Sequence, residues 1–327
     1  MSFSFSLAVL AIVAILLIVV FITIRLTLLY TRVLLARPAD KSIDMSEPPI
    51  AVASPYQLVQ ARHGWMLVNP NDFYLGRAIV EYGEYGELES QFLVRLLEIR
   101  PGTVVEVGAN IGTHTVSLAK ALAPEMRKIV AFEPQPFIFQ NLCANLALNG
   151  LTNVTAWPWA CGAKTEVVYF TLPDYNELGN FGGISMGAET PSGSVAVPCV
   201  RLDDIIGADT VSLLKIDVEG YELLTLQGAM DILTHSRPVL YVENDRVEKS
   251  QALIEWLWTQ NYQLFWHIPR LFNPDNFFGK EENIYGDVVS LNMLGLPREL
   301  GIPTEGMQEI ANATEHPLQH FQHQRIT

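Results

Sequence analysis

The chain has 327 residues, of which 49% are hydrophobic and 17% are charged, and its net charge is −14. This composition excludes intrinsic disorder and provides enough apolar residues for one large α/β domain or two smaller domains. The acidic balance argues against nucleic acid as a partner, because phosphate backbones are bound by clustered Lys and Arg. The 3 cysteines are widely spaced, which excludes a disulfide scaffold and any Cys-x-x-Cys motif.

The first part of the chain has the strongest apolar signal. Residues 7–24 are apolar except for Thr23, and a helix of this length spans about 27 Å, close to the ~30 Å hydrocarbon core of a bilayer. A cleaved signal peptide is the alternative, but no basic residue precedes the run. Basic residues follow it, which predicts a single-pass membrane helix with the main domain in the cytoplasm. These residues are Arg25, Arg32, Arg37 and Lys41.

Composition divides the chain into segments. Residues 1–37 are predicted to form the transmembrane helix and a juxtamembrane segment, and the proline-containing residues 38–55 a linker. Residues 56–303 are predicted to form one α/β domain. The polar residues 304–327 are expected to form a tail that is a surface helix or is disordered.

From residue 104 onward, apolar strands alternate with helices. Strands are predicted over 104–110, 128–134, 154–162, 211–220, 238–245, 262–268 and 287–297. Helices are predicted over 113–123, 137–150, 221–233 and 249–260, and residues 166–200 are predicted to form a hairpin with a long loop. Continuous apolar strands separated by helices indicate a parallel sheet that is covered on both faces. Because no clear helix separates the last two strands, one of them is expected to be antiparallel.

The first predicted strand runs into a glycine loop that opens a helix. The segment contains Glu106, Gly108, Asn110 and Gly112 in the pattern E-V-G-A-N-I-G. Glycine at such a turn allows a ligand to approach the backbone beyond the strand end. The dinucleotide fingerprint G-x-G-x-x-G would place its second and third glycines at Asn110 and Thr113, so an NAD-dependent oxidoreductase is disfavoured.

An acidic residue, Glu133, ends the second predicted strand. It follows Gly108 by 25 residues. An acid at this position can accept hydrogen bonds from both hydroxyls of an adenosine ribose. The alternative is a carboxylate that only interacts with the dipole of the following helix.

Four motifs, in order, resemble the FkbM family of S-adenosylmethionine-dependent methyltransferases: EVGANIGTHT, FEPQP, LLKIDVEGYELLTLQGA and VEND. The resemblance covers about residues 82–297. It implies a class I methyltransferase (Rossmann-like) fold, with a seven-stranded, mostly parallel sheet and helices on both faces. It also implies O-methylation of a hydroxyl on a sugar, a glycolipid or a natural-product precursor. By this resemblance, Glu106, Gly108, Asn110 and Gly112 border the methionine part of S-adenosylmethionine, and Glu133 holds its ribose.

The predicted strand over 211–220 contains alternating charges. Lys215, Asp217 and Glu219 fall on one side of it. Charged groups in an apolar strand are costly to bury, so they indicate a crevice; the alternative is an ion pair of Lys215 with Asp217 or Glu243 that braces the sheet. Methyl transfer to a hydroxyl requires a group that orients the hydroxyl and accepts its proton. Asp217 is the first candidate for this role and Glu243 the second, while Lys215 could polarise the acceptor or tune Asp217.

Two further alternatives concern metal and function. Asp217, Glu243 and Asn244 could supply oxygen ligands to Mg²⁺, but a metal-free site is favoured. The acceptor walls are predicted in residues 173–196 and 273–279, and the acceptor is expected to be a small molecule, a glycan or a lipid-linked hydroxyl compound. The alternative function is a non-catalytic, membrane-anchored adaptor that retains the fold.

Overall fold

A computed structural model of the chain describes residues 53–184, 194–304 and 306–319. The predicted membrane helix over residues 7–24 and most of the predicted linker lie outside these ranges and stay predictions. Across the described ranges, no helix combines the length and the apolar character that crossing a bilayer requires.

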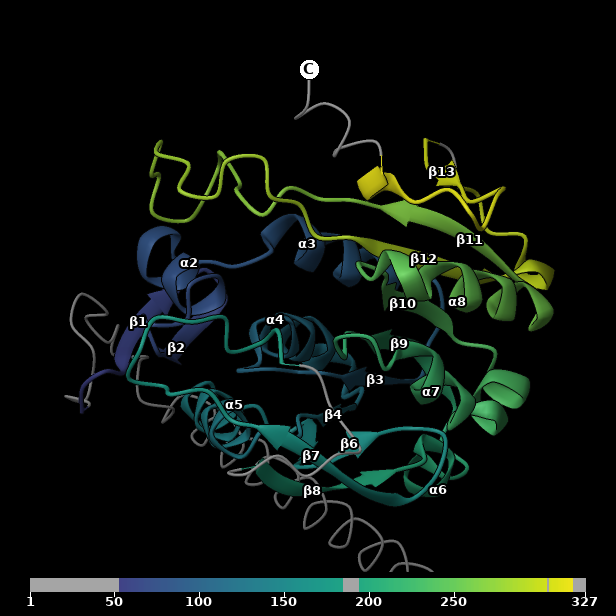
Figure 1. The fold of residues 1–327 in the computed structure, drawn as a ribbon, viewed down its shortest axis with the longest axis horizontal. Coiled ribbons are helices and arrows are strands. Elements are labelled where there is room, and N and C mark those ends of the chain that lie inside the picture. Colours follow the sequence, from purple (N-terminus) through teal and green to yellow (C-terminus); the bar gives the residue numbers. More distant parts are fainter. Residues whose placement is uncertain (1–52, 185–193, 305, 320–327) are drawn as a thin grey trace, which may run out of the picture. The chain divides into compact units, whose positions relative to one another are not determined.

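The central sheet has 8 strands, and their order identifies the fold class. The order is β5 (Val154–Trp157), β4 (Ile129–Phe132), β3 (Thr103–Val107), β9 (Val211–Ile216), β10 (Val239–Glu243), β12 (Asn292–Pro297), β11 (Tyr262–His267) and β13 (Gln308–Glu309) (Figure 1). The strands from β5 to β10 are parallel, whereas β12 is antiparallel to both of its neighbours. The predicted class I methyltransferase sheet is therefore present, β12 is its expected antiparallel strand, and β13 adds an edge strand.

Helices cover both faces of this sheet (Figure 1). One face packs against α2 (Leu75–Tyr82), α3 (Glu87–Leu96), α4 (Thr113–Leu122) and α5 (Pro136–Leu148). The other face packs against α6 (Leu202–Ile206), α7 (Glu222–Gln227) and α8 (Val247–Thr259). Every residue of β3 and β9 is buried because helices cover these central strands on both sides.

Two smaller sheets complete the described strands. β1 (Gln57–Ala61) and β2 (Gly64–Val68) form an antiparallel hairpin, and β2 contacts α5. β6 (Ala160–Cys161), β8 (Ser194–Val200) and β7 (Glu166–Thr171) form the other sheet, in which β7 and β8 are the hairpin predicted over 166–200. The prediction of one strand over 154–162 is wrong, because β5 and β6 belong to different sheets. Pro158 lies between them and has no N–H to donate to a strand ladder.

The C-terminal region differs from the sequence prediction. β13 pairs with β11, and Ile310, Ala313 and His316 are buried, so the domain extends past the boundary predicted at residue 303. The helix predicted over 221–233 is also interrupted: α7 ends before Gly228, and a short π-helix follows over Ile232–Ser236.

Candidate active site

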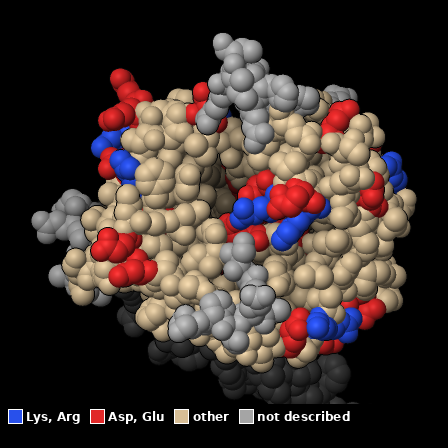
Figure 2. Space-filling model, viewed as in Figure 1, with Lys and Arg blue, Asp and Glu red and all other residues tan. Residues whose placement is uncertain are grey.

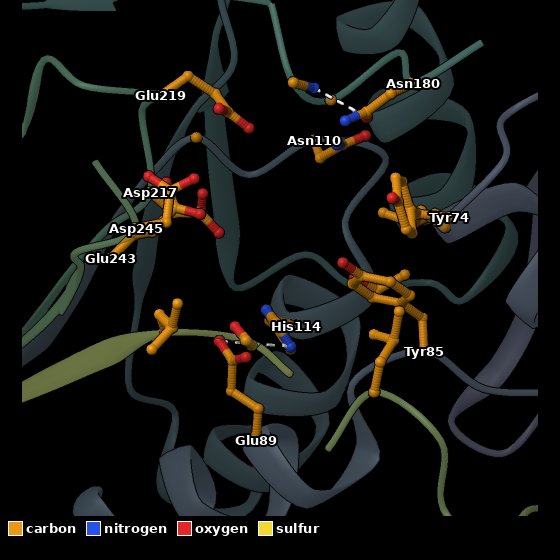
Figure 3. Close-up of a pocket in the computed structure, with 18 of the residues that line it drawn as sticks. Tyr74, Tyr85, Glu89, Asn110, His114, Asn180, Asp217, Glu219, Glu243 and Asp245 are labelled. Atoms are coloured by element: carbon orange, nitrogen blue, oxygen red, sulfur yellow. Dashed lines mark hydrogen bonds and ion pairs between the residues drawn. The ribbon is translucent and has the colours of Figure 1, made fainter. Parts of the chain in front are cut away.

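A cavity of about 430 Å³ opens where the parallel strands β3, β4, β9 and β10 end. Figure 2 shows a hollow near the centre of the visible surface, and acidic and basic side chains gather beside it. Ligands of open parallel sheets bind at this edge, so motifs that are far apart in the sequence meet in one place. The lining residues from the four strand ends are Gly108 and Asn110 after β3, Glu133 after β4, Asp217 and Glu219 after β9, and Glu243 and Asp245 at the end of β10. Figure 3 labels Asn110, Asp217, Glu219, Glu243 and Asp245.

The glycine loop is held close to the end of β9. Gly108 has a φ of +83°, and a Cβ atom at this position would lie 1.7 Å from the carbonyl oxygen of Asp217. Any side chain there would push the ends of β3 and β9 apart. Asn110 also has a positive φ, of +50°, which turns its backbone N–H toward Glu133. The loop is thus fixed between two strand ends that both reach the cavity.

Glu133 is buried at the cavity wall. Its Oε2 accepts a hydrogen bond from the backbone N–H of Asn110, and its Oε1 accepts one from the N–H of Gln135, both at 2.9 Å. Burial raises the pKa of Glu133 to about 7, although these N–H groups act in the opposite direction. Each carboxylate oxygen has a second lone pair, so Glu133 can still accept hydrogen bonds from a pair of hydroxyls. Its ribose-binding role stays a prediction.

Lys215 is the buried cation of the site. Its side chain is 1% exposed, and its Nζ lies 3.2 Å from Oδ2 of Asp217 and 3.8 Å from Oε1 of Glu106. Burial by itself would lower the pKa of Lys215, but the carboxylates of Asp217, Glu106 and Glu89 outweigh it and hold the pKa above its ordinary value. Lys215 is therefore an ammonium group that orients Asp217 and cannot act as a base.

Glu243 provides a second carboxyl group at the same wall. Its Oε2 is buried and has no hydrogen-bond partner among the residues that the structure describes. Burial, followed by the charges of Asp217, Asp245 and Glu219, raises the pKa of Glu243 well above its ordinary range. This carboxyl group therefore holds its proton more tightly than an exposed glutamate does.

Two residues carried over from the family resemblance lie behind the cavity wall rather than in it. Glu106 is 1% exposed, accepts a hydrogen bond from Oγ1 of Thr115 at 2.7 Å and faces Lys215. Gly112 precedes the first residue of α4, and a Cβ atom there would meet Leu142. Neither residue is among those that line the cavity.

The alternative Mg²⁺ ligands are not gathered in the cavity. The side-chain amide of Asn244 donates to Oγ of Ser250 and to Sδ of Met293, away from Asp217 and Glu243, which do line the cavity. Among the residues that the structure describes, no group of 3 or more His, Cys, Asp or Glu side chains is arranged to hold a metal ion.

The predicted acceptor walls are present only in part. Asn180, Gly182 and Gly183, from the long loop after β7, line the cavity. The segment 273–279 does not line it. Its Asn273 side chain and the N–H of Phe277 instead bind the buried carboxylate of Glu84. This part of the prediction is wrong because the polar residues of the segment hold a loop in place.

The sequence interpretation did not identify the opposite wall. Tyr74, Tyr85 and Glu89 line the cavity, although they come from the region before β3 (Figure 3). A signal for Glu89 was present: it shares one stripe of α3 with the buried Leu93 and Leu96. An acid in an apolar stripe is expensive to bury unless it has a partner or a function.

The comparisons with known proteins agree with the motifs. Residues 106–264 match the family model of the methyltransferase FkbM domain. The chain is 33% identical over 157 residues to methyltransferase sdnD of Sordaria araneosa, a match that covers 38% of this chain and 59% of that protein. It is 30% identical over 151 residues to methyltransferase 1 of Beauveria bassiana (strain ARSEF 2860), covering 39% of this chain and 58% of that protein.

The chain thus spans less than three fifths of the length of these two relatives. A crystal structure of methyltransferase FkbM from Methylobacillus flagellatus KT is also similar, with 17% identity, a TM-score of 0.39, and coverage of 59% of this chain and 43% of that chain. Because that score is low, the fold class rests on the strand order. The matches in sequence support the resemblance to FkbM methyltransferases and a methyltransferase function.

Proposed function

We propose that the chain is an S-adenosylmethionine-dependent methyltransferase that methylates a hydroxyl oxygen of a sugar, a glycolipid or a natural-product precursor. The observation that carries the proposal is the meeting of Gly108, Glu133 and Asp217 at one cavity, beyond the ends of adjacent parallel strands. Membrane anchoring through residues 7–24, with the domain on the cytosolic side, belongs to the same proposal and rests on the sequence alone.

The residues at the cavity suit this cofactor. The cavity is rich in carboxylates, and S-adenosylmethionine carries a sulfonium and an ammonium group. Glu133 retains acceptor capacity for the ribose hydroxyls, and Gly108 and Asn110 expose backbone beside it. When bound, S-adenosylmethionine supplies an electrophilic methyl group.

Lys215 and the side chains beside it position the acceptor hydroxyl and accept its proton. Asp217 is partly exposed at the cavity wall, so it can accept a hydrogen bond from the acceptor hydroxyl and then its proton. The buried ammonium of Lys215 holds Asp217 in place. Glu243, whose Oε2 has no partner among the described residues, can form a hydrogen bond with a polar group of the acceptor. We assign the base to Asp217 and a positioning role to Lys215.

Calorimetry on the full chain tests the cofactor. S-adenosylmethionine should bind at one site and NAD should not, and Glu133→Gln should weaken the binding by about 1–3 kcal/mol, the scale of hydrogen bonds to a charged group. Glu98→Gln is the control, because Glu98 is exposed just after α3 and does not line the cavity. A folded wild-type chain that does not bind S-adenosylmethionine would contradict the proposal and favour the adaptor function.

A further inference from the structure

The cavity lining has an excess of acidic side chains over basic ones. Figure 3 shows Asn110 and Asn180 at one end, and Glu89 with His114 at the other. Seven carboxyl side chains line the whole cavity, against one Lys and one Arg. Both of these cations already have carboxylate partners: Lys215 pairs with Asp217, and Arg246 pairs with Glu219 and Asp245.

Four of these carboxyl groups have no such partner among the described residues: Asp72, Glu89, Glu133 and Glu243. Asp72 and Glu133 instead accept hydrogen bonds from backbone N–H groups, which leaves Glu89 and Glu243. Within the described ranges, no Lys or Arg nitrogen lies within ion-pair distance of Glu89 or Glu243. The Nε2 of His114 is 3.9 Å from Oε1 of Glu89, but burial, and then the charge of Lys215, lower the pKa of His114 well below its ordinary value. His114 is therefore neutral. The charge of Lys215 acts on the buried Glu89 only from beyond ion-pair distance, and the half-buried Glu243 has no Lys or Arg within that distance among the described residues.

Two polar atoms without partners in the described ranges belong to residues that line this cavity. In the part of the chain that the structure describes, two buried side-chain atoms have no hydrogen-bond partner: Nε2 of His114 and Oε2 of Glu243. Both residues line the cavity, and His114 is only 6% exposed. Buried polar groups are nearly always satisfied, so two exceptions at one cavity indicate that a ligand supplies their partners.

Aromatic side chains face this acidic wall. Tyr74 and Tyr85 lie across the cavity from Asp217 and Glu243 (Figure 3). A carboxylate wall opposite aromatic rings favours an organic cation, because carboxylates pair with an ammonium group and ring faces attract it. An anionic group such as a phosphate or a carboxylate would meet buried like charges and would be rejected.

We propose that the part of the cavity between Glu89, Glu243 and the rings of Tyr74 and Tyr85 is the acceptor subsite, and that it recognises an acceptor carrying a protonated amine. Glu89 and Glu243 bind the ammonium group, and Tyr74 and Tyr85 cover its hydrocarbon neighbours. This inference rests on the proposed methyltransferase function and narrows its acceptor to an amino alcohol, such as an amine-bearing sugar or lipid precursor.

The test uses the full chain saturated with S-adenosylhomocysteine, at pH 7.5 and constant ionic strength. The probes are ethanolamine, ethylene glycol and glycolate, which have similar size and carry an ammonium, a hydroxyl or a carboxylate group. Ethanolamine should bind at least ~10-fold more tightly than ethylene glycol, and glycolate should bind least, because charge-assisted hydrogen bonds to buried carboxylates form only with the amine. Glu89→Gln and Glu243→Gln should each remove most of this preference.

Glu87→Gln is the matched control on the same helix. The Glu87 carboxylate is buried but binds His63 and Gln91 outside the cavity, so this variant should keep the preference even if the domain loses stability. Equal or reversed binding of the three probes, or an unchanged preference in Glu89→Gln and Glu243→Gln, would overturn the inference. Displacement of S-adenosylhomocysteine by ethanolamine would also overturn it, by placing the cation site within the cofactor site. Binding of S-adenosylhomocysteine, measured separately, tests the methyltransferase proposal itself.

Discussion

The sequence left open whether Lys215 braces the sheet through an ion pair or serves the active site, and the structure gives it contacts for both roles. Its register partner on β3 is Glu106 and its neighbour along the chain is Asp217, so one ammonium group joins a buried carboxylate to a partly exposed one. The ion pair with Asp217 exists, as the structural alternative required. It also points the Asp217 carboxylate into the cavity, as the catalytic alternative required. Substitution of each partner separates these contributions.

Asp217→Asn should preserve cofactor binding and lower turnover by about 10²–10⁴-fold, the usual effect of losing a general base. The domain should stay folded because Glu106 still faces Lys215. Lys215→Met should instead destabilise the domain by about 3–5 kcal/mol, since it leaves Glu106 as an uncompensated buried charge. Thermal melting and S-adenosylhomocysteine release, measured on the same samples, check both outcomes. Normal turnover in Asp217→Asn would move the base assignment to another group.

At the level of secondary structure, the sequence predicted the elements whose apolar pattern is continuous. The parallel strands β3, β4, β9 and β10 were found because each is a short apolar run between helices. The hairpin β1–β2 and the helices α2 and α3 were not predicted, and α3 carries Glu89 to the cavity. Their contribution depends on packing against α4, α5 and the sheet. The apolar stripe of α3 indicates a helix, but it does not indicate which elements the helix packs against.

The C-terminal tail was also misjudged because its apolar residues are few. Ile310 and Ala313 are buried in the same core as α8, and the Nε2 of His316 lies 2.9 Å from the carbonyl oxygen of Asn244. That contact fixes the chain between Glu243 and Asp245, both of which line the cavity. A polar segment can thus support the site through three well-placed side chains.

Truncation measures this support. Deleting residues 304–327 should lower the free energy of unfolding by about 2–5 kcal/mol, because it uncovers the apolar surface that Ile310 fills and removes β13. Deleting residues 320–327 is the matched control and should leave the described packing intact. Chemical denaturation compares the two truncations. Equal stability of both would mean that residues 304–319 add nothing to the fold.

At the scale of the whole molecule, the acidity is concentrated inside as well as on the surface. Burial raises the pKa of Asp72 to about 6 and the pKa values of Glu89, Glu133 and Glu219 to about 7, and all four residues line the cavity. Each of these carboxyl groups binds its proton more tightly in the folded chain than in the unfolded chain. At neutral pH these carboxyl groups therefore lower the free energy of unfolding of the domain, as expected for residues that serve function at the expense of stability.

This cost predicts the pH dependence of stability. The folded-state pKa of Glu89 and Glu133 lies above the unfolded value of about 4.5, so the stability they contribute is complete below pH ~4.5 and is lost as the pH rises to about 7. The free energy of unfolding at pH 5.5 should therefore exceed that at pH 8 by on the order of 2–4 kcal/mol.

Glu89→Gln should flatten this slope because an amide does not titrate, whereas Glu98→Gln, on the surface, should leave it unchanged. Denaturation midpoints across this pH range provide the measurement, and a stability that rises toward pH 8 would show that the buried carboxylates are compensated by a cation in the protein itself.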